Sequence, residues 1–241
     1  MNICCLFTFT FFINISIYNS AIAQKESLPE SIPANYIKQY FLNEEGVATH
    51  LYTGKEYVGY EKTIKGDPFF ATSEMEGNSL FYDGSLYENV PLLFDIVSNQ
   101  IIINRYHDNL KIKLLSEKIK YFTLAGHRFE NVDMAQKDGT IANGIYDLVV
   151  DGKIMVFVKR SKRIVNSMKA EEPPKFVEDD EFFIQNGNTF YPVEGNSSLL
   201  QALSDKKNLI KIFIRKNKFK FKKNIEKEII MTAAYYNTLK I

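Results

Sequence analysis

The chain has 241 residues, of which 24% are charged and 45% hydrophobic, and its formal net charge at pH 7 is +1. This balance excludes a disordered, collagen-like or polytopic membrane protein, and the length allows one large β domain or two smaller ones. The 2 cysteines, Cys4 and Cys5, both lie in an apolar N-terminal stretch. The rest of the chain therefore has no disulfide framework, no cysteine-ligated zinc site and no cysteine nucleophile.

The first 23 residues have the pattern of a signal peptide. An apolar run covers residues 3–17, and Ala21-Ile22-Ala23 follows it as a cleavage motif, so cleavage is expected before Gln24. A membrane anchor is the alternative, but a span needs about 18 apolar residues, and polar residues interrupt this run early. We therefore expect an exported protein that is not integral to the membrane once residues 1–23 are removed.

Short β-type runs separated by turn dipeptides follow an N-terminal segment, residues 24–45. Asp151-Gly152 lies between runs at 145–150 and 153–158 and predicts a two-residue type I′ hairpin, because Asp-Gly tolerates positive φ. The same kind of pattern predicts reversals at Asp83-Gly84, Ser98-Asn99 and Asn186-Gly187. Further strands are predicted at residues 49–52, 57–64, 110–115, 119–124 and 128–132. Such spacing without helices indicates an antiparallel β domain over 46–165, a meander that forms a sandwich or barrel-like sheet.

The pattern changes after residue 165. Residues 166–181 contain Pro173-Pro174 and a run of acids, and we predict a linker or a long surface loop there. Residues 182–241 are predicted to form a β-hairpin followed by a basic helical part. The expected fold class is therefore α+β, mainly β with C-terminal helices.

Three helices are predicted in the C-terminal part. Ser198 and Gln201 have the spacing of a capping box, which predicts a short helix near 198–203. A second helix is predicted over 205–216 and a third after the capping residue Asn224. The apolar face of the second is assigned to Leu209, Ile212, Phe213 and Lys216. The buried stripe of the third is assigned to Ile225, Ile229, Ala233 and Tyr236.

Few residue patterns indicate catalysis. The 3 histidines lie far apart at 50, 107 and 127, which leaves no helical zinc motif, and we predict no metal site and no cofactor. His127 is a weak catalytic candidate, because a lone histidine in a turn is usually solvated. Asp83, Glu88 and Asp95 are weak candidates for the paired carboxylates of a glycosidase. Their places at a turn and on solvent-facing strand positions give a simpler explanation.

The segment from Asp205 to Glu228, here called the basic segment, carries ten Lys or Arg and three acids, a net charge of +7, so the remainder of the chain carries −6. Five lysines near its centre are the candidate contacts for an anionic surface: Lys216, Lys218, Lys220, Lys222 and Lys223. Phe219 and Phe221 alternate with the lysines, which is typical of a connector with one buried and one solvated face. A merely solvated face is the alternative, and nucleic acid is not expected as a partner of an exported chain.

Several blocks resemble a family of exported proteins of Gram-negative bacteria of the Bacteroidota type. The similarity rests on Gly66-Asp67-Pro68-Phe69-Phe70, Gly126-His127-Arg128-Phe129 and the segments 77–84, 86–96 and 209–223. This resemblance implies a periplasmic or envelope-associated place, and it brings no activity and no site residues with it. We predict a non-catalytic binding or scaffold module of the cell envelope, with an anionic envelope component or a protein as partner. A metal-free glycan hydrolase is the alternative.

Overall fold

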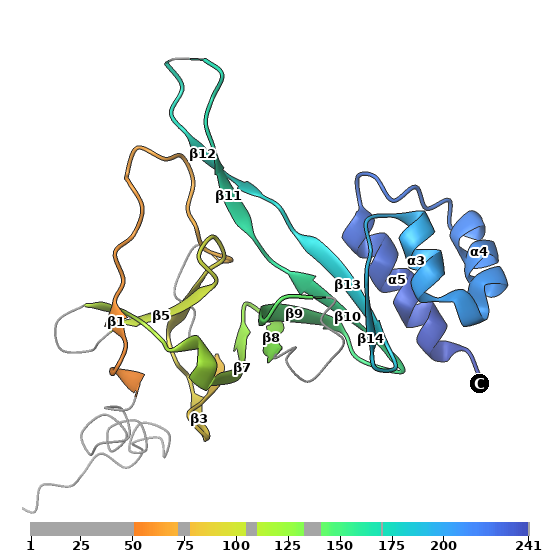
Figure 1. Cartoon of the computed structure of the whole chain (residues 1–241), viewed down its shortest axis with the longest axis horizontal. Helices are drawn as coiled ribbons and strands as arrows, with labels where there is room; N and C mark the ends of the chain where they lie inside the picture. Colours follow the sequence, from red (N-terminus) through yellow and green to blue (C-terminus); the bar gives the residue numbers. More distant parts are fainter. Residues whose placement is uncertain (1–50, 72–77, 105–109, 133–140, 170, 241) are drawn as a thin grey trace, which may run out of the picture.

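The computed structural model describes residues 51–71, 78–104, 110–132, 141–169 and 171–240 (Figure 1). The predicted signal peptide and the segment 24–45 lie outside these residues. The strands are β1 (Lys55–Glu56), β2 (Ser79–Tyr82), β3 (Ser85–Glu88), β4 (Leu92–Asp95), β5 (Gln100–Asn104), β6 (Lys111–Lys113), β7 (Ile119–Leu124), β8 (His127–Val132), β9 (Gly144–Val150), β10 (Ile154–Lys159), β11 (Lys162–Val165), β12 (Lys175–Glu178), β13 (Glu181–Asn186) and β14 (Thr189–Pro192). The helices are η1 (Ser116–Lys118), α3 (Asn196–Ala202), η3 (Ser204–Lys206), α4 (Lys207–Lys216) and α5 (Ile225–Thr238).

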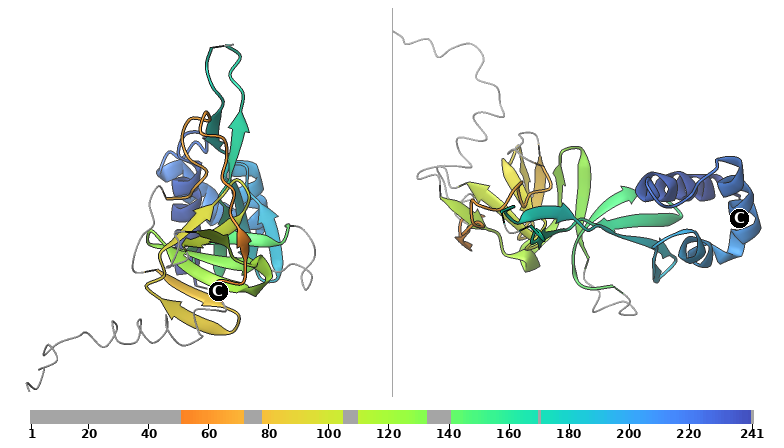
Figure 2. Two further views of the ribbon diagram at one scale, coloured as in Figure 1. Left: turned by 90° about the vertical axis from the view of Figure 1, so that its left-hand side faces the viewer. Right: turned by 90° about the horizontal axis from the view of Figure 1, so that it is seen from above.

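The predicted fold class is confirmed: the chain is mainly β and antiparallel, with helices at its C-terminal end. An eight-stranded sheet has the order β14-β13-β10-β9-β8-β7-β2-β3, and a four-stranded sheet has the order β1-β6-β5-β4. A third sheet consists of β11 and β12 alone. Within the described residues none of these sheets closes into a barrel. The molecule is elongated, with the four-stranded sheet near one end and the helices at the other (Figure 2).

Three clusters of buried hydrophobic side chains lie against the eight-stranded sheet, and the smallest includes Phe157, Phe183 and Phe190. The cluster near β1–β8 is mostly Leu and Ile and includes an aromatic group. In this group the ring of Phe94 from the four-stranded sheet meets Phe122 and Phe129, with centroids 5.5 and 5.2 Å apart. At the other end, α5 packs mainly on β9 and β10, and α3 packs on β13 and β14. Ile229 and Ala233 of α5 are fully buried in the cluster at this end. The continuous sheet therefore joins the two ends of the molecule.

The hairpin predictions are confirmed in position but not always in turn geometry. Asp83 and Gly84 have φ values of 49° and 80°, the positive values that a type I′ turn needs. At Asp151-Gly152 the prediction of a two-residue turn is wrong, because Val150 pairs with Val156 and the loop is longer. A Cβ on Gly152 would lie 2.3 Å from Nδ2 of Asn237, so this glycine allows α5 to approach the sheet.

Residues 166–181 do not form a simple linker, because they include β12. This strand pairs with β11, from Lys162↔Glu178 to Val165↔Lys175, in a hairpin that projects beyond the sheets (Figures 1 and 2). On either side of the hairpin, β10 and β13 pair with each other in the eight-stranded sheet. The sheet thus continues across the predicted boundary. The strand predicted at 57–64 is also wrong, since the structure has β1 at Lys55–Glu56 and a loop after it.

The helices form where predicted, with two corrections to their details. The first helix begins at Asn196 rather than Ser198, and the Ser198 hydroxyl accepts a hydrogen bond from the backbone N–H of Gly195. In α4 the buried residues are Ile210 and Ile214, so the face predicted around Leu209 and Ile212 is the wrong one. The stripe predicted for α5 is confirmed at Ile229, Ala233 and Tyr236.

Candidate functional site

The five candidate lysines all lie exposed at the end of α4 and in the loop that connects it to α5. Within the described part of the chain no ion pair involves any of them. The two phenylalanines between them point inward, as predicted: Phe221 is buried and Phe219 half-buried. Their rings pack edge to face with centroids 6.3 Å apart, and Phe219 packs in the same way on Phe213.

The loop that carries these lysines has a defined backbone conformation. The backbone at Lys218 and Phe221 has positive φ values of 55° and 50°, which are uncommon for residues other than glycine. The Glu228 carboxylate accepts hydrogen bonds from the backbone N–H groups of Lys220 and Phe221. Because Phe221 is also anchored in the core, the loop presents its lysine side chains from a fixed backbone.

Each of the three acids of the basic segment is held by a hydrogen bond or an ion pair. Asp205 accepts a hydrogen bond of 2.7 Å from the Tyr236 hydroxyl, and Glu226 is paired with Arg160 at 2.6 Å. Glu228 binds backbone N–H groups, as described above. Among the described residues none of these three carboxylates forms an ion pair with a lysine of the segment, whose net charge is +7.

The structure places the three candidate carboxylates at separate positions. Asp83 lies in the β2–β3 turn and pairs with Lys118 at 2.8 Å. Glu88 lies at the other end of β3, about 10 Å along the strand from Ser85 at the rise expected per residue. Asp95 belongs to β4 in the four-stranded sheet. The three carboxylates therefore lie on different elements of the structure.

Asp95 is fully buried, so the prediction that it occupies a solvent-facing strand position is wrong. Its carboxylate accepts hydrogen bonds from the hydroxyls of Tyr57 and Tyr60, both at 3.1 Å. It also accepts the backbone N–H groups of Val97 and Ser98, which close the turn between β4 and β5. Burial, and then the charge of this carboxylate, raises the pKa of both tyrosines above the ordinary value. Asp95 therefore ties the loop after β1 to the four-stranded sheet.

His127 takes part in a charged cluster that the sequence does not predict. Its Nδ1 lies 2.8 Å from Oδ2 of Asp147, a carboxylate that is 1% exposed. Arg160 donates two further hydrogen bonds to the same Oδ2, at 2.9 and 2.7 Å. The guanidinium also reaches Asp180 at 2.8 Å and Glu226 at 2.6 Å. This charged cluster of five side chains joins β8, β9, the end of β10, the start of β13 and α5.

Hydrogen bonds within the charged cluster favour the ionised forms of Arg160 and Glu226. Burial alone disfavours a charged guanidinium, but hydrogen bonds to Glu226, Asp180 and Asp147 outweigh it, and the pKa of Arg160 is raised. The same hydrogen bonds hold the pKa of Glu226 below its usual range. Asp147 Oδ1 is buried and has no hydrogen-bond partner among the described residues. A histidine oriented by a carboxylate can act as the general base of a nucleophilic site, which also needs a hydroxyl or thiol nucleophile. No hydroxyl or thiol among the described residues hydrogen-bonds the His127 ring.

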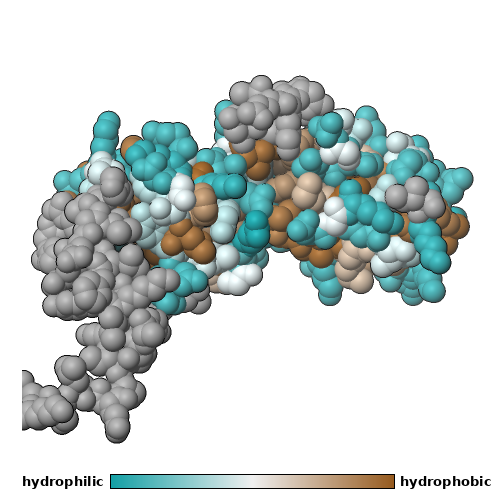
Figure 3. All heavy atoms as spheres, turned by 90° about the horizontal axis from the view of Figure 1, so that it is seen from below, coloured by the Kyte–Doolittle hydropathy of each residue, from teal (hydrophilic) through white to brown (hydrophobic). Residues whose placement is uncertain are grey.

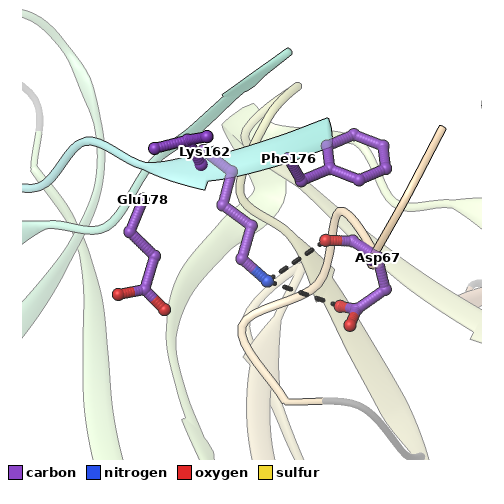
Figure 4. Close-up of a pocket in the computed structure, with 6 residues that line it drawn as sticks. Asp67, Lys162, Phe176 and Glu178 are labelled. Atoms are coloured by element: carbon purple, nitrogen blue, oxygen red, sulfur yellow. Dashed lines mark hydrogen bonds and ion pairs between the residues drawn. The ribbon is translucent and has the colours of Figure 1, made fainter. Parts of the chain in front are cut away.

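A shallow pocket lies where the β11–β12 hairpin meets the loop before β2 (Figure 4). Its volume is about 470 Å³, and its lining includes Asp67, Lys162, Phe176 and Glu178. The Lys162 ammonium donates to the backbone oxygen of Phe69 at 2.6 Å and to that of Asp67 at 3.1 Å. The Lys162 side chain thus holds the hairpin to this loop, and its ammonium group is hydrogen-bonded there.

The residues described contain no group of three or more His, Cys, Asp or Glu side chains that could hold a metal ion. No helix among them has the length and apolar character needed to cross a membrane. Comparison with known proteins finds no family model, no curated protein and no solved structure that matches the chain. The resemblance to exported proteins therefore stays a prediction.

Proposed function

We propose that this chain is an exported protein of the cell envelope, a non-catalytic binding module whose basic segment binds an anionic partner. The observation that carries the proposal is the arrangement of the segment's acids. Asp205 and Glu226 are bound to Tyr236 and Arg160, and Glu228 is bound to backbone N–H groups of the loop. The side chains of Lys216, Lys218, Lys220, Lys222 and Lys223 are exposed at the end of α4 and on the loop after it.

Electrostatics and preorganisation support this function together. The basic segment carries a net charge of +7 and the rest of the chain carries −6. This separation of charge orients the molecule so that the basic segment faces anionic partners. Because Glu228 and Phe221 hold the backbone, binding has to order only the lysine side chains and not the loop. A segment that served only as a solvated face would gain nothing from such a fixed conformation.

The glycan hydrolase is the weaker proposal. It requires two carboxyl groups about 5 to 10 Å apart across a cleft. Asp83 is paired with Lys118, and Asp95 is buried under two tyrosines and two backbone N–H groups. The carboxylates that line the pocket described above are Asp67 and Glu178, and Lys162 lies beside them. No observation favours catalysis by the predicted trio.

The test is retention of the purified exported chain on phosphocellulose, eluted with a salt gradient. We expect the triple variant Lys218→Glu, Lys220→Glu, Lys222→Glu to elute at markedly lower salt than the wild type. A matched control changes the exposed lysines Lys55, Lys62 and Lys65 to Glu, which alters the net charge equally at the other end of the molecule. Equal elution shifts for both triples would show a net-charge effect and overturn the proposed role of the segment.

A further inference from the structure

Helix α4 forms an outer layer of the molecule. It packs mainly on α3 and α5, which themselves lie on the eight-stranded sheet, and it lies at the end of the long axis (Figures 1 and 2). Its buried side chains are Ile210 and Ile214, one turn apart. The opposite face of α4 is therefore directed away from the rest of the protein.

That outward face carries two apolar side chains. Leu209 is 44% exposed and Ile212 is 55% exposed. Ile212 stands two residues from both Ile210 and Ile214, which places it about half a turn around the helix from the buried side. Leu209, Ile212 and Lys216 follow the spacing i, i+3, i+7, so they form one continuous stripe that ends in the first of the candidate lysines.

Cations border the stripe. Lys207, Lys211 and Arg215 are all exposed and follow one another at a spacing of four residues along one flank of α4. Beyond Lys216 the loop adds the other candidate lysines. On the surface, apolar side chains at this end of the molecule stand among hydrophilic ones (Figure 3). A protruding helix with an apolar outer stripe and a basic border has the pattern of an interfacial membrane-binding helix.

We propose that α4 docks on the surface of an anionic lipid bilayer, with Leu209 and Ile212 in the headgroup region and the surrounding cations on lipid phosphates. The proposal rests on the proposed function and names the partner class for it. A bilayer fits better than an acidic protein, because α4 is a convex outermost helix, and a flat, deformable surface accepts a protruding stripe without a matching groove. Long Lys and Arg side chains reach phosphates while their stems lie along the apolar surface.

The test is co-sedimentation of the purified exported chain with vesicles of mixed phosphatidylcholine and phosphatidylglycerol. We expect the double variant Leu209→Ser, Ile212→Ser to lower the partition coefficient about tenfold, equivalent to about 1.4 kcal/mol. Both side chains are exposed, so the change leaves the core intact. The matched control is Val58→Ser, Leu86→Ser, which replaces two apolar residues that are 81% and 51% exposed elsewhere. This control should sediment as the wild type does.

Two results would overturn the docking and leave the proposed function standing. In the first, the serine double variant binds vesicles as well as the wild type while the lysine-to-glutamate triple does not, which means charge attraction without insertion. In the second, the wild type does not co-sediment with vesicles but is retained on phosphocellulose, which indicates a protein or glycan partner. Failure of the proposed function is different, because the triple reversal would then shift elution from phosphocellulose no more than the control change of Lys55, Lys62 and Lys65 does.

Discussion

Arg160 holds the helical end of the molecule to the sheet, and its removal should destabilise the whole chain. The guanidinium donates five hydrogen bonds to Asp147, Asp180 and Glu226, and it lies over the ring of Phe70 at 5.7 Å. The substitution Arg160→Met keeps much of the side-chain volume and removes the charge. It leaves Asp147 buried, with His127 Nδ1 as its remaining neighbour at hydrogen-bond distance.

The expected loss of stability is about 3 to 5 kcal/mol, the cost of removing one partner from a buried ion pair. Five charge-assisted hydrogen bonds at about 1.5 to 3 kcal/mol each would suggest more. The larger sum does not apply, because Asp180 and Glu226 are 20% and 35% exposed and regain water when Arg160 is absent. Asp147, at 1% exposed, cannot do so and accounts for most of the loss.

The assay is urea unfolding followed by far-ultraviolet circular dichroism, with stabilities compared at equal m-values. Arg163→Met is the matched control, since Arg163 and Asp179 form an ion pair in which both side chains are about 60% exposed. That pair should contribute at most about 1 kcal/mol. If Arg160→Met and Arg163→Met have similar stabilities, the charged cluster does not join the helical end to the sheet.

Two further predictions concern α5. Gly152→Ala should destabilise the folded chain by about 1 to 3 kcal/mol, because a Cβ displaces Asn237 from its two hydrogen bonds with the backbone of Ile154. Gly59→Ala is the control, since a Cβ there meets only ordinary contacts, and its melting temperature should stay near that of the wild type. Burial, and then Asp205, raises the pKa of Tyr236 to about 12, so the folded state favours the neutral phenol. The resulting stability is present below pH 10 and is lost as pH rises from 10 toward 12. Tyr236→Phe should therefore show a smaller alkaline drop in Tm than the wild type, and an equal drop would contradict this assignment.

The sequence predicts local structure well where one pattern decides it. Alternating apolar runs with a turn between them locate β2–β3, β4–β5, β9–β10 and β13–β14, because the strand period and the turn residues act together over a few positions. Asp151-Gly152 shows the limit of such a pattern. The dipeptide suggests a tight turn, but Gly152 instead leaves room for Asn237 of α5, which lies 85 residues further along the chain. No local signal distinguishes a glycine needed for a turn from a glycine needed for helix packing.

The apolar face of α4 was assigned wrongly for a related reason. Leu209, Ile212 and Phe213 make as good a helical stripe as Ile210 and Ile214, and only the positions of α3 and α5 decide which is buried. The charged cluster was missed because it forms between distant segments: Arg160 and Glu226 are 66 residues apart. One signal was present, since Asp147 interrupts the apolar run 145–150, and a buried acid needs a partner.

The charged cluster and the basic segment are linked through Glu226. This carboxylate belongs to the basic segment by sequence, yet it is paired with Arg160, and this pairing fixes the start of α5 to the sheet. Asp205 and Glu228 act in the same way through Tyr236 and the loop backbone. The contacts that hold these three acids are therefore the contacts that set the orientation of the helices. If α4 rests on a bilayer, the same contacts hold the four-stranded sheet at the far end of the long axis, away from the lipid surface (Figure 2).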